Sequence, residues 1–186
     1  DPSILGISTG ASLGVAIVML IGGSALSSIT GSLAAHLTTL SGAFVGAMAV
    51  LAMLIAFSSF VKSATMILII GIMVSYLTSS AISLLNFFAT EEGVHSFVIW
   101  GMGNFSGVSA DEISFFTIAI IISLLAAILM VKPLNALLLG TRYAENLGVN
   151  IKRTRNTLLI ITGLLTAVVT AYCGPISFLG LVVPHI

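Results

Sequence analysis

Long apolar runs separated by short polar breaks dominate the pattern of this chain. Five such runs lie at about 4–23, 40–61, 64–88, 113–131 and 156–173. A helix needs about 20 mostly apolar residues to cross roughly 30 Å of hydrocarbon, and each run meets or approaches that length. The pattern therefore predicts an all-α, polytopic transmembrane helix bundle with about five spans, forming a single domain.

The composition supports a membrane protein. Hydrophobic residues make up 58% and charged residues 6% of the 186 residues, and the mean hydropathy is +1.23. Soluble domains carry roughly 25% charged residues, so a water-soluble domain is excluded. The net charge is zero, and no basic patch with interleaved aromatic residues indicates nucleic acid. Cys173 is the single cysteine, which excludes a disulfide framework within one chain.

The charged residues indicate how the bundle is oriented. If the first run starts on the cytoplasmic side, all six Lys and Arg residues fall in cytoplasmic segments, as the positive-inside rule requires. Glu91, Glu92, Asp111 and Glu112 then fall outside. Because the chain begins without an initiator Met or a charged leader, we expect it to be the middle of a longer polypeptide.

The sequence shows no catalytic constellation. The three histidines (His36, His95 and His185) lie in different loops or at the chain end, so interfacial or capping roles are favoured over a metal site. The spans lack ionisable residues at mid-depth, which weighs against a proton-driven carrier and against a channel with charged rings. A passage lined by neutral residues, with energy supplied from elsewhere, fits better. We expect neither enzyme activity nor a cofactor nor a bound metal.

Small residues recur at helical spacing in the first two runs. Gly6, Gly10 and Gly14 form two overlapping GxxxG spacings, and Gly42 with Gly46 forms another. Lipid-immersed helices associate through small residues that allow close backbone approach. We therefore expect these glycines to lie in packing seams inside one subunit, with a pore-lining role as the alternative.

A short apolar segment interrupts the acidic outer loop. The segment GVHSFVIWGMG follows Glu91 and Glu92 and precedes Asn104. At about 10 residues it is too short to cross the membrane, so it suits a re-entrant or interfacial helix. Phe97 and Trp100 would lie at the level of the lipid headgroups. Such a helix is either a packing element or a gate for an outward opening.

The segment 132–155 is the one long, charged, helix-forming stretch of the chain. Gly140 allows a sharp change of direction between two short helices. The second helix carries Ala144 and Leu147 on one face, and Gly148 ends it. Apolar faces with a basic fringe favour a docking surface for a cytoplasmic partner. The alternative is a membrane-surface hairpin that anchors basic residues to lipid headgroups.

Four motifs in the chain resemble those of a known family. They read DPSILGISTGASLG at 1–14, IWGMGNFSG at 99–107, LNALLLGTRYAENLGV at 134–149 and GPISFLGLVVPHI at 174–186. In this combination and order they are similar to motifs of the FecCD-type permease subunits of type II ABC importers. That family takes up iron-siderophores, haem and cobalamin, and the likeness spans the chain from end to end.

The resemblance implies a permease of about ten helices, of which residues 1–186 supply the third to the seventh and lack the N- and C-terminal helices. It also implies a set of partners. These are cytoplasmic ATP-binding subunits, a second permease subunit (an identical copy or a paralogue), an extracytoplasmic substrate-binding protein and membrane lipid. The implied location is the bacterial cytoplasmic (inner) membrane, with several passes.

The resemblance also assigns roles to residues. Segment 132–155 becomes the cytoplasmic coupling segment, with ATPase-coupling residues Leu137, Leu138, Gly140, Arg142, Ala144, Leu147 and Gly148. The short outer helix becomes a gate or a contact for the binding protein, through Glu91, Glu92, Phe97, Trp100 and Asn104. The sequence departs from the family at Thr141 and Arg142, where paired acidic residues are more usual. The outer face also lacks a basic cluster.

The expected function is a permease for iron(III)-siderophore complexes, driven by ATP hydrolysis on a separate chain. Cobalamin and haem are alternatives within the family, because no residue selects among the three. Two other classes stay open. One is a secondary carrier driven by an ion gradient, and the other is an export permease of related architecture.

Overall fold

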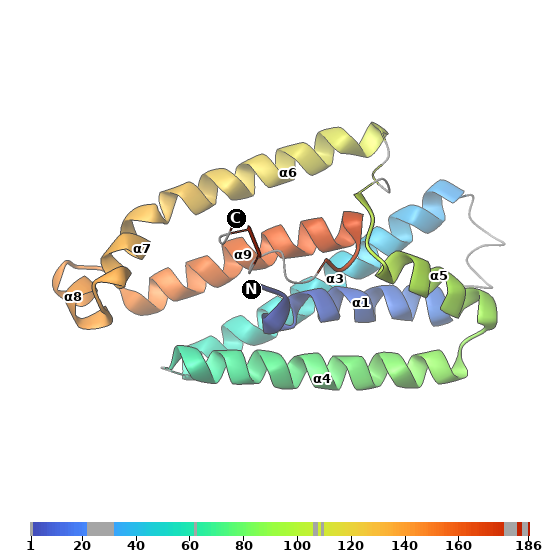
Figure 1. Cartoon of the computed structure of the whole chain (residues 1–186), viewed down its shortest axis with the longest axis horizontal. Helices are drawn as coiled ribbons and strands as arrows, with labels where there is room; N and C mark the ends of the chain where they lie inside the picture. The colour runs from blue at the N-terminus through green and yellow to red at the C-terminus, as the bar shows by residue number, and fades with distance from the viewer. Residues whose placement is uncertain are drawn as a thin grey trace.

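The computed structural model describes residues 2–21, 32–61, 63–105, 108, 110–176, 182–183 and 186. Its elements are η1 (Pro2–Leu5), α1 (Ile7–Ala16), η2 (Ile17–Ile21), α3 (Ser32–Phe60), α4 (Ala64–Phe88), α5 (Glu91–Gly101), α6 (Ala110–Leu129), α7 (Val131–Leu138), α8 (Thr141–Asn146) and α9 (Ile151–Cys173). The elements of these described residues are helical, which confirms the predicted all-α bundle (Figure 1).

Four helices in the described part are long and apolar enough to cross a membrane, namely α3, α4, α6 and α9. Helix α4 has the predicted bounds. Helix α3 begins at Ser32 rather than near residue 40, so the loop expected up to residue 39 is helical from that point. The prediction placed these polar residues in a loop, because they do not suit the hydrocarbon of a membrane. A helix can nevertheless continue beyond the hydrocarbon. Helix α9 begins at Ile151 rather than near 156, because the Asn150 side chain caps it by accepting a hydrogen bond from the Arg153 N–H at 3.0 Å.

The α-helix of the first apolar run begins at Ile7 rather than near residue 4. The apolar helical part of this run is Ile7–Leu20, and its last residues belong to the π-helical η2. Gly6 precedes α1 with φ of 81°, a left-handed conformation that separates α1 from η1. Figure 1 shows that α1 starts near the middle of the bundle rather than at one end. Within the described residues, the five predicted runs therefore correspond to four helices long and apolar enough to span a membrane and to the helix Ile7–Leu20.

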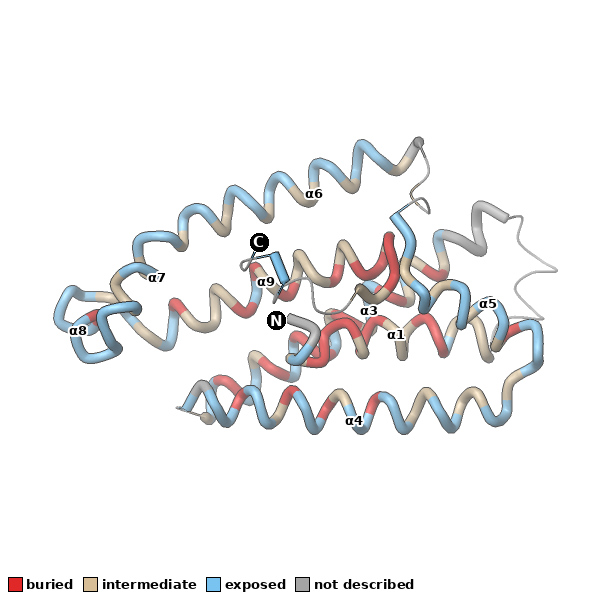
Figure 2. The backbone as a smooth tube through the Cα atoms, in the orientation of Figure 1, coloured by how far each residue is buried: buried red, intermediate tan, exposed pale blue. Residues whose placement is uncertain are grey.

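Helix α1 lies at the centre of the packing and contacts α3, α4 and α9. Its side chains Ile7, Ala11 and Val15 are fully buried in the hydrophobic core. The buried hydroxyls of Ser8 and Thr170 pair at 3.4 Å across the α1–α9 contact, which satisfies polar groups inside an apolar bundle. Figure 2 shows buried positions concentrated on α1 and on the helix faces turned toward it.

Helix α6 stands apart from this core. It packs against α9, but none of the residues Glu112–Leu129 is buried (Figure 2). The outward side of α4 is also largely exposed. These faces are apolar over most of their length, as is typical of surfaces that meet lipid or further helices rather than water.

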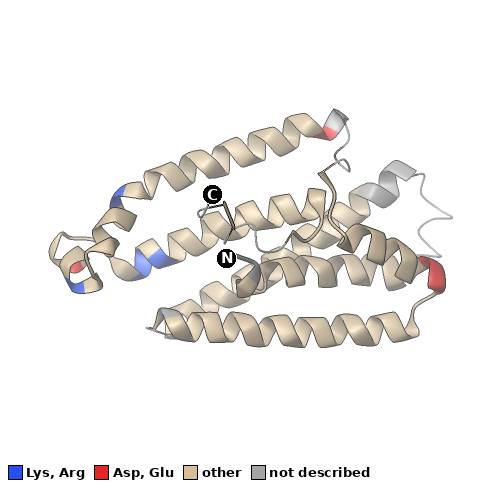
Figure 3. Cartoon of the chain, in the orientation of Figure 1, with Lys and Arg blue, Asp and Glu red and all other residues tan. Residues whose placement is uncertain are grey.

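The charged residues divide between the two ends of the bundle (Figure 3). One end, called the basic end here, contains α7, α8 and the start of α9. It carries Glu145 and five basic residues, Lys132, Arg142, Lys152, Arg153 and Arg155. The opposite, acidic end contains the starts of α5 and α6, with Glu91, Glu92 and Glu112. Some sequence predictions concern positions outside the described residues, namely Lys62, positions 106–107 and most of the C-terminal motif.

Candidate functional site

Helices α1 and α3 touch through their backbones. A Cβ added to Gly14 would overlap the carbonyl oxygen of Gly42, and one added to Gly46 would overlap that of Gly10. A Cβ on Gly10 would lie 2.8 Å from the Gly46 carbonyl oxygen. Four of the five predicted packing glycines thus lie in one seam between these two helices. The fifth, Gly6, faces α4 instead.

The acidic end contains the short helix α5. Thr90 caps its start, because the side-chain oxygen accepts a hydrogen bond from the Gly93 N–H at 3.3 Å. Glu91 and Glu92 lie exposed in the first turn, where negative charge stabilises a helix N-terminus. From there α5 runs back toward the middle of the bundle (Figure 1), as a re-entrant helix does.

The two aromatic residues of α5 face the protein. Phe97 and Trp100 stack with ring centroids 6.3 Å apart, and both are only partly exposed. They pack against the hydrophobic core cluster, which bears on the side of α5 that they occupy and not on their depth in the membrane. Their position at the level of the lipid headgroups stays a prediction.

The end of α5 is fixed to the end of α9. The Asn104 N–H donates to the Cys173 carbonyl oxygen at 2.7 Å. Gly103 and Gly174 have φ of 69° and 78°, and a Cβ on Gly174 would lie 2.6 Å from the Trp100 carbonyl oxygen. Two of the motifs that the sequence places about 70 residues apart therefore meet in space. A cavity of about 370 Å³ adjoins the contact, lined by Met19, Thr39, Leu40, Ser96, Ile99, Trp100, Asn104, Ala171, Tyr172, Cys173 and Gly174.

At the basic end, α7 and α8 form a bent pair around Gly140, which has φ of 105°. Gly148 ends α8 with φ of 81°. The Val149 N–H donates to the Ala144 carbonyl and the Gly148 N–H to the Glu145 carbonyl, which is the hydrogen-bond pattern of a Schellman motif. The two glycines therefore shape this segment through backbone conformation, and a Cβ on either would meet nothing within 4 Å.

The bent pair exposes several large apolar side chains. Leu138 is 84% exposed, Leu139 66%, Leu147 59% and Tyr143 51%. Arg142 is also exposed, and Leu137 is partly buried. The i, i+3 spacing predicted that Ala144 and Leu147 share one face of α8. Ala144 is fully buried, whereas Leu147 is exposed, so this prediction is wrong. We call Leu138, Leu139, Tyr143 and Leu147 the α7–α8 surface.

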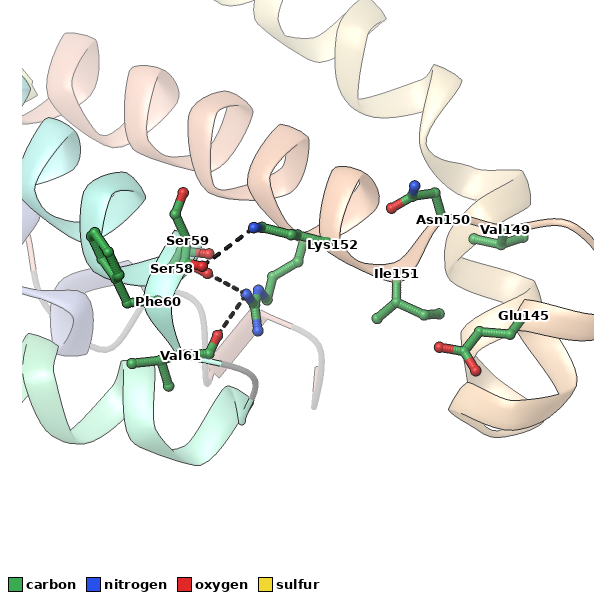
Figure 4. A pocket seen from close by; sticks show the side chains of 10 residues that line it. Ser58, Ser59, Phe60, Val61, Glu145, Val149, Asn150, Ile151 and Lys152 are labelled. Atoms are coloured by element: carbon green, nitrogen blue, oxygen red, sulfur yellow. Dashed lines mark hydrogen bonds between the residues drawn. The ribbon is translucent and has the colours of Figure 1, made fainter.

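Two basic residues of α9 bind the end of α3 rather than a surface partner (Figure 4). Arg155 Nη2 donates to the carbonyl oxygens of Ser58 at 2.5 Å and of Val61 at 2.9 Å. Lys152 Nζ donates to the Ser59 carbonyl oxygen at 3.2 Å. The last carbonyls of a helix lack partners within it, so these cations cap α3 from another helix.

Helix α4 carries hydroxyl groups on its exposed side. Its buried positions follow one stripe and are Ile67, Gly71, Val74 and Thr78. The opposite face, in the half of α4 nearer the acidic end, carries exposed polar side chains at helical spacing: Tyr76, Ser79, Ser80 and Ser83. Tyr76 is 72% exposed. The Ser80 and Ser83 hydroxyls donate to the Tyr76 and Ser79 carbonyl oxygens of the same helix at 2.9 and 3.0 Å, so they are satisfied within α4.

The sequence interpretation missed two of these features, although both have a signal in the sequence. Cations in the first turns of a helix oppose the helix dipole, so Lys152 and Arg155 indicated a negative partner nearby. The spacing of Tyr76, Ser79 and Ser83 placed hydroxyls on one face of an otherwise apolar run. The identity of the partner, the end of α3, has no signal in the sequence.

Fold and site together define a multi-span α-helical membrane protein with the short helix α5 at its acidic end and a bent helix pair at its basic end. Its sequence matches the FecCD transport family over residues 1–186, and the chain belongs to that family. The family resemblance of the four motifs is thereby confirmed.

Two curated relatives and one solved structure show how far the similarity reaches. The chain is 29% identical to the hemin transport system permease protein HmuU of Yersinia pestis over 187 residues. It is 32% identical to the vitamin B12 import system permease protein BtuC of Salmonella paratyphi A over 186 residues. Both alignments cover 100% of this chain and 54% of the relative.

The solved structure is described as an inward-facing conformation of a putative metal-chelate type ABC transporter. It superposes with a TM-score of 0.83 at 29% identity, over 100% of this chain and 56% of that one. The chain thus spans about half the length of the proteins that it matches.

Proposed function

We propose that the chain is the middle part of a permease subunit in a binding-protein-dependent ABC importer for metal chelates. Family membership supports a transport role. The names of its relatives concern haemin and vitamin B12, and the description of the solved structure concerns a metal chelate. An iron(III)-siderophore stays our predicted cargo, with haem and cobalamin as alternatives.

The observation that carries the proposal is the α7–α8 surface. It places four large, mostly exposed apolar or aromatic side chains at the basic end, beyond the ends of the spans. Exposed apolar patches of this kind mark interaction sites, and an apolar helix face is typical of helix-in-groove docking. The occupant that we propose is the ATP-binding subunit of the importer.

The alternative role, an anchor on lipid headgroups, is less well supported. It needs the basic residues of the segment to point outward to phosphate groups. Lys152 and Arg155 donate to carbonyl oxygens of α3, whereas Lys132, Arg142 and Arg153 are exposed. The basic residues therefore do not decide between the two roles, and the exposed apolar side chains of the α7–α8 surface favour the protein partner.

The hydroxyl face of α4 supports a proposal for where the transport pathway lies. Tyr76, Ser79, Ser80 and Ser83 lie opposite the packed side of α4, so they face away from this chain's own core. We infer that this face meets the second permease subunit across a passage that holds water. The acidic end then faces the substrate-binding protein, and α5 is the element nearest to it.

An ion-gradient carrier is the competing class. In the described spans, charged side chains lie only at the ends, whereas carriers of that kind keep ionisable groups at mid-depth. Such a carrier would need those groups in segments outside this chain.

The test is transport by the full-length protein, reconstituted with its ATP-binding subunits, second permease and binding protein. Haemin, cyanocobalamin and a ferric hydroxamate are offered in turn, with and without ATP and with a protonophore. We expect uptake of one of the three that needs ATP and survives the protonophore. Uptake that proceeds without ATP and stops with the protonophore would support the carrier instead.

A further inference from the structure

The start of α9 contains a charge arrangement that is unfavourable for α9 itself. Lys152, Arg153 and Arg155 lie in its first turns, close to the positive pole of the helix dipole. Acidic residues are absent from its first turn. Two of these cations, Lys152 and Arg155, are directed at the negative pole of α3. They therefore stabilise the end of α3 and not the start of α9.

The contacts between α9 and the end of α3 form a compact group. One guanidinium nitrogen of Arg155 joins the Ser58 and Val61 carbonyls, which lie on either side of the end of α3 at Phe60. The Ser58 hydroxyl adds a hydrogen bond of 2.7 Å to Oδ1 of Asn156. Ser58 is fully buried, whereas Lys152 is exposed. Arg155 is therefore the main cation at this contact.

A cavity separates α8 from the end of α3 among the described residues. It has a volume of about 560 Å³, with Glu145 and Val149 on one side and Phe60 and Val61 on the other (Figure 4). The hydrogen bonds of Lys152 and Arg155 cross beside it.

Backbone hydrogen bonds link α8 to the start of α9. The Val149 N–H bonds to Ala144 in α8, and Asn150 caps α9 through the Arg153 N–H. On the far side, Val61 lies in the turn that leads into α4. A displacement of α8 can therefore reach the α3–α4 turn through Arg155.

We propose that Arg155 is a positioning residue that makes the α3–α4 turn move together with α8. The proposal rests on the proposed function, because it takes the movement of α8 from the ATP-binding subunit. Both carbonyls accept from the same nitrogen, Nη2, whose two hydrogens lie in the plane of the guanidinium, whereas the ammonium of a lysine rotates freely about its last bond.

The test uses spin-label distances and transport in the full-length, fully assembled importer, on a Cys173→Ala background. One label pair joins Phe60 and Asn146, both exposed, and a reference pair joins Asn146 and Glu92 at the opposite end. Each is measured without nucleotide and after trapping with ATP and vanadate. Arg155→Gln is compared with Arg153→Gln, which removes the same charge from an exposed neighbour. Uptake per ATP hydrolysed is measured for each variant with the chelate that the wild type transports.

With Arg155 present, we expect nucleotide to shift the reference pair and to leave the Phe60–Asn146 distances unchanged. In Arg155→Gln, those distances should broaden and respond to nucleotide. Uptake per ATP should fall about tenfold below Arg153→Gln, a typical size for coupling between two sites. Arg155→Lys should give an intermediate result, and it serves as the test if Arg155→Gln does not assemble.

Two results would overturn the inference, and they are distinguishable. If Arg155→Gln or Arg155→Lys matches Arg153→Gln in both distances and coupling while the wild type responds to ATP, Arg155 has no transmitting role. If the wild-type reference pair does not respond to ATP at all, the proposed function itself fails, and the role of Arg155 fails with it.

Discussion

Individual glycines decide how closely the helices of this protein approach. In α1 and α3, Gly10, Gly14, Gly42 and Gly46 face one another, so the two backbones touch where any side chain would hold them apart. Inside a lipid environment the hydrophobic effect does not drive helices together, and dispersion contacts of this kind have greater weight. The spacing of these glycines was visible in the sequence. Which helix Gly6 faces was not visible, because that depends on where α1 begins.

Replacement of Gly14 by alanine tests this seam. The new Cβ would overlap the Gly42 carbonyl oxygen, so α1 and α3 must separate. We expect a loss of about 1–3 kcal/mol in stability, the usual cost of overpacking, measured as a lower midpoint of unfolding of the full-length protein in detergent. The matched control is Gly101→Ala, because a Cβ there meets nothing within 4 Å. Equal midpoints for the two variants would mean that the seam does not hold α1 to α3.

At the scale of elements, the apolar pattern predicted where helices lie better than where they end. Helix α4 is bounded on both sides by residues in extended conformation, Ser63 and Ala89, and its predicted bounds were correct. Helix α3 continues through polar residues that the pattern assigned to a loop, and α1 is cut short by the turn at Gly6. Hydropathy reports burial in lipid and not hydrogen bonding, so it does not locate these ends.

Prediction from the sequence had the same limit at the candidate site. The bend at Gly140 and the end of α8 near Gly148 could be predicted, because both depend on local backbone conformation. The burial of Ala144 could not, since it depends on how α8 packs. Nor could the partners of Arg155, which lie 94 and 97 residues away along the chain.

The end of α8 gives a prediction at this scale. In Gly148→Ala the new Cβ would meet nothing within 4 Å, but the alanine would have to adopt φ of 81°. This conformation costs a side-chain-bearing residue about 1–2 kcal/mol, so the Schellman motif should weaken and the last turn of α8 should fray. Hydrogen–deuterium exchange of the α8 amides should accelerate. Asn146→Ala, at the last helical residue, is the control, since alanine favours helix; faster exchange in that control alone would contradict the assignment.

At the scale of the whole molecule, helix α9 connects the two ends of the bundle. The α7–α8 surface lies at the basic end, and α5 lies at the acidic end, fixed to α9 through Asn104 and Gly174. Helix α9 is continuous from Ile151 to Cys173, so it connects the proposed docking surface with α5. A continuous helix of this kind suits the proposed importer, whose energy source would lie on one side of the membrane and whose cargo would enter from the other.

The most direct test of the central claim is ATP-driven uptake by Leu138→Asp in the reconstituted importer. Leu138 is 84% exposed, so the change should leave the bundle folded while it places a charge in the proposed groove of the ATP-binding subunit. Asn146→Asp adds the same charge to α8 without removing an apolar side chain and serves as the control. We predict that uptake per ATP falls about tenfold or more in Leu138→Asp relative to that control, a loss in the range typical of coupling between sites. Undiminished coupling in correctly assembled Leu138→Asp would contradict the account.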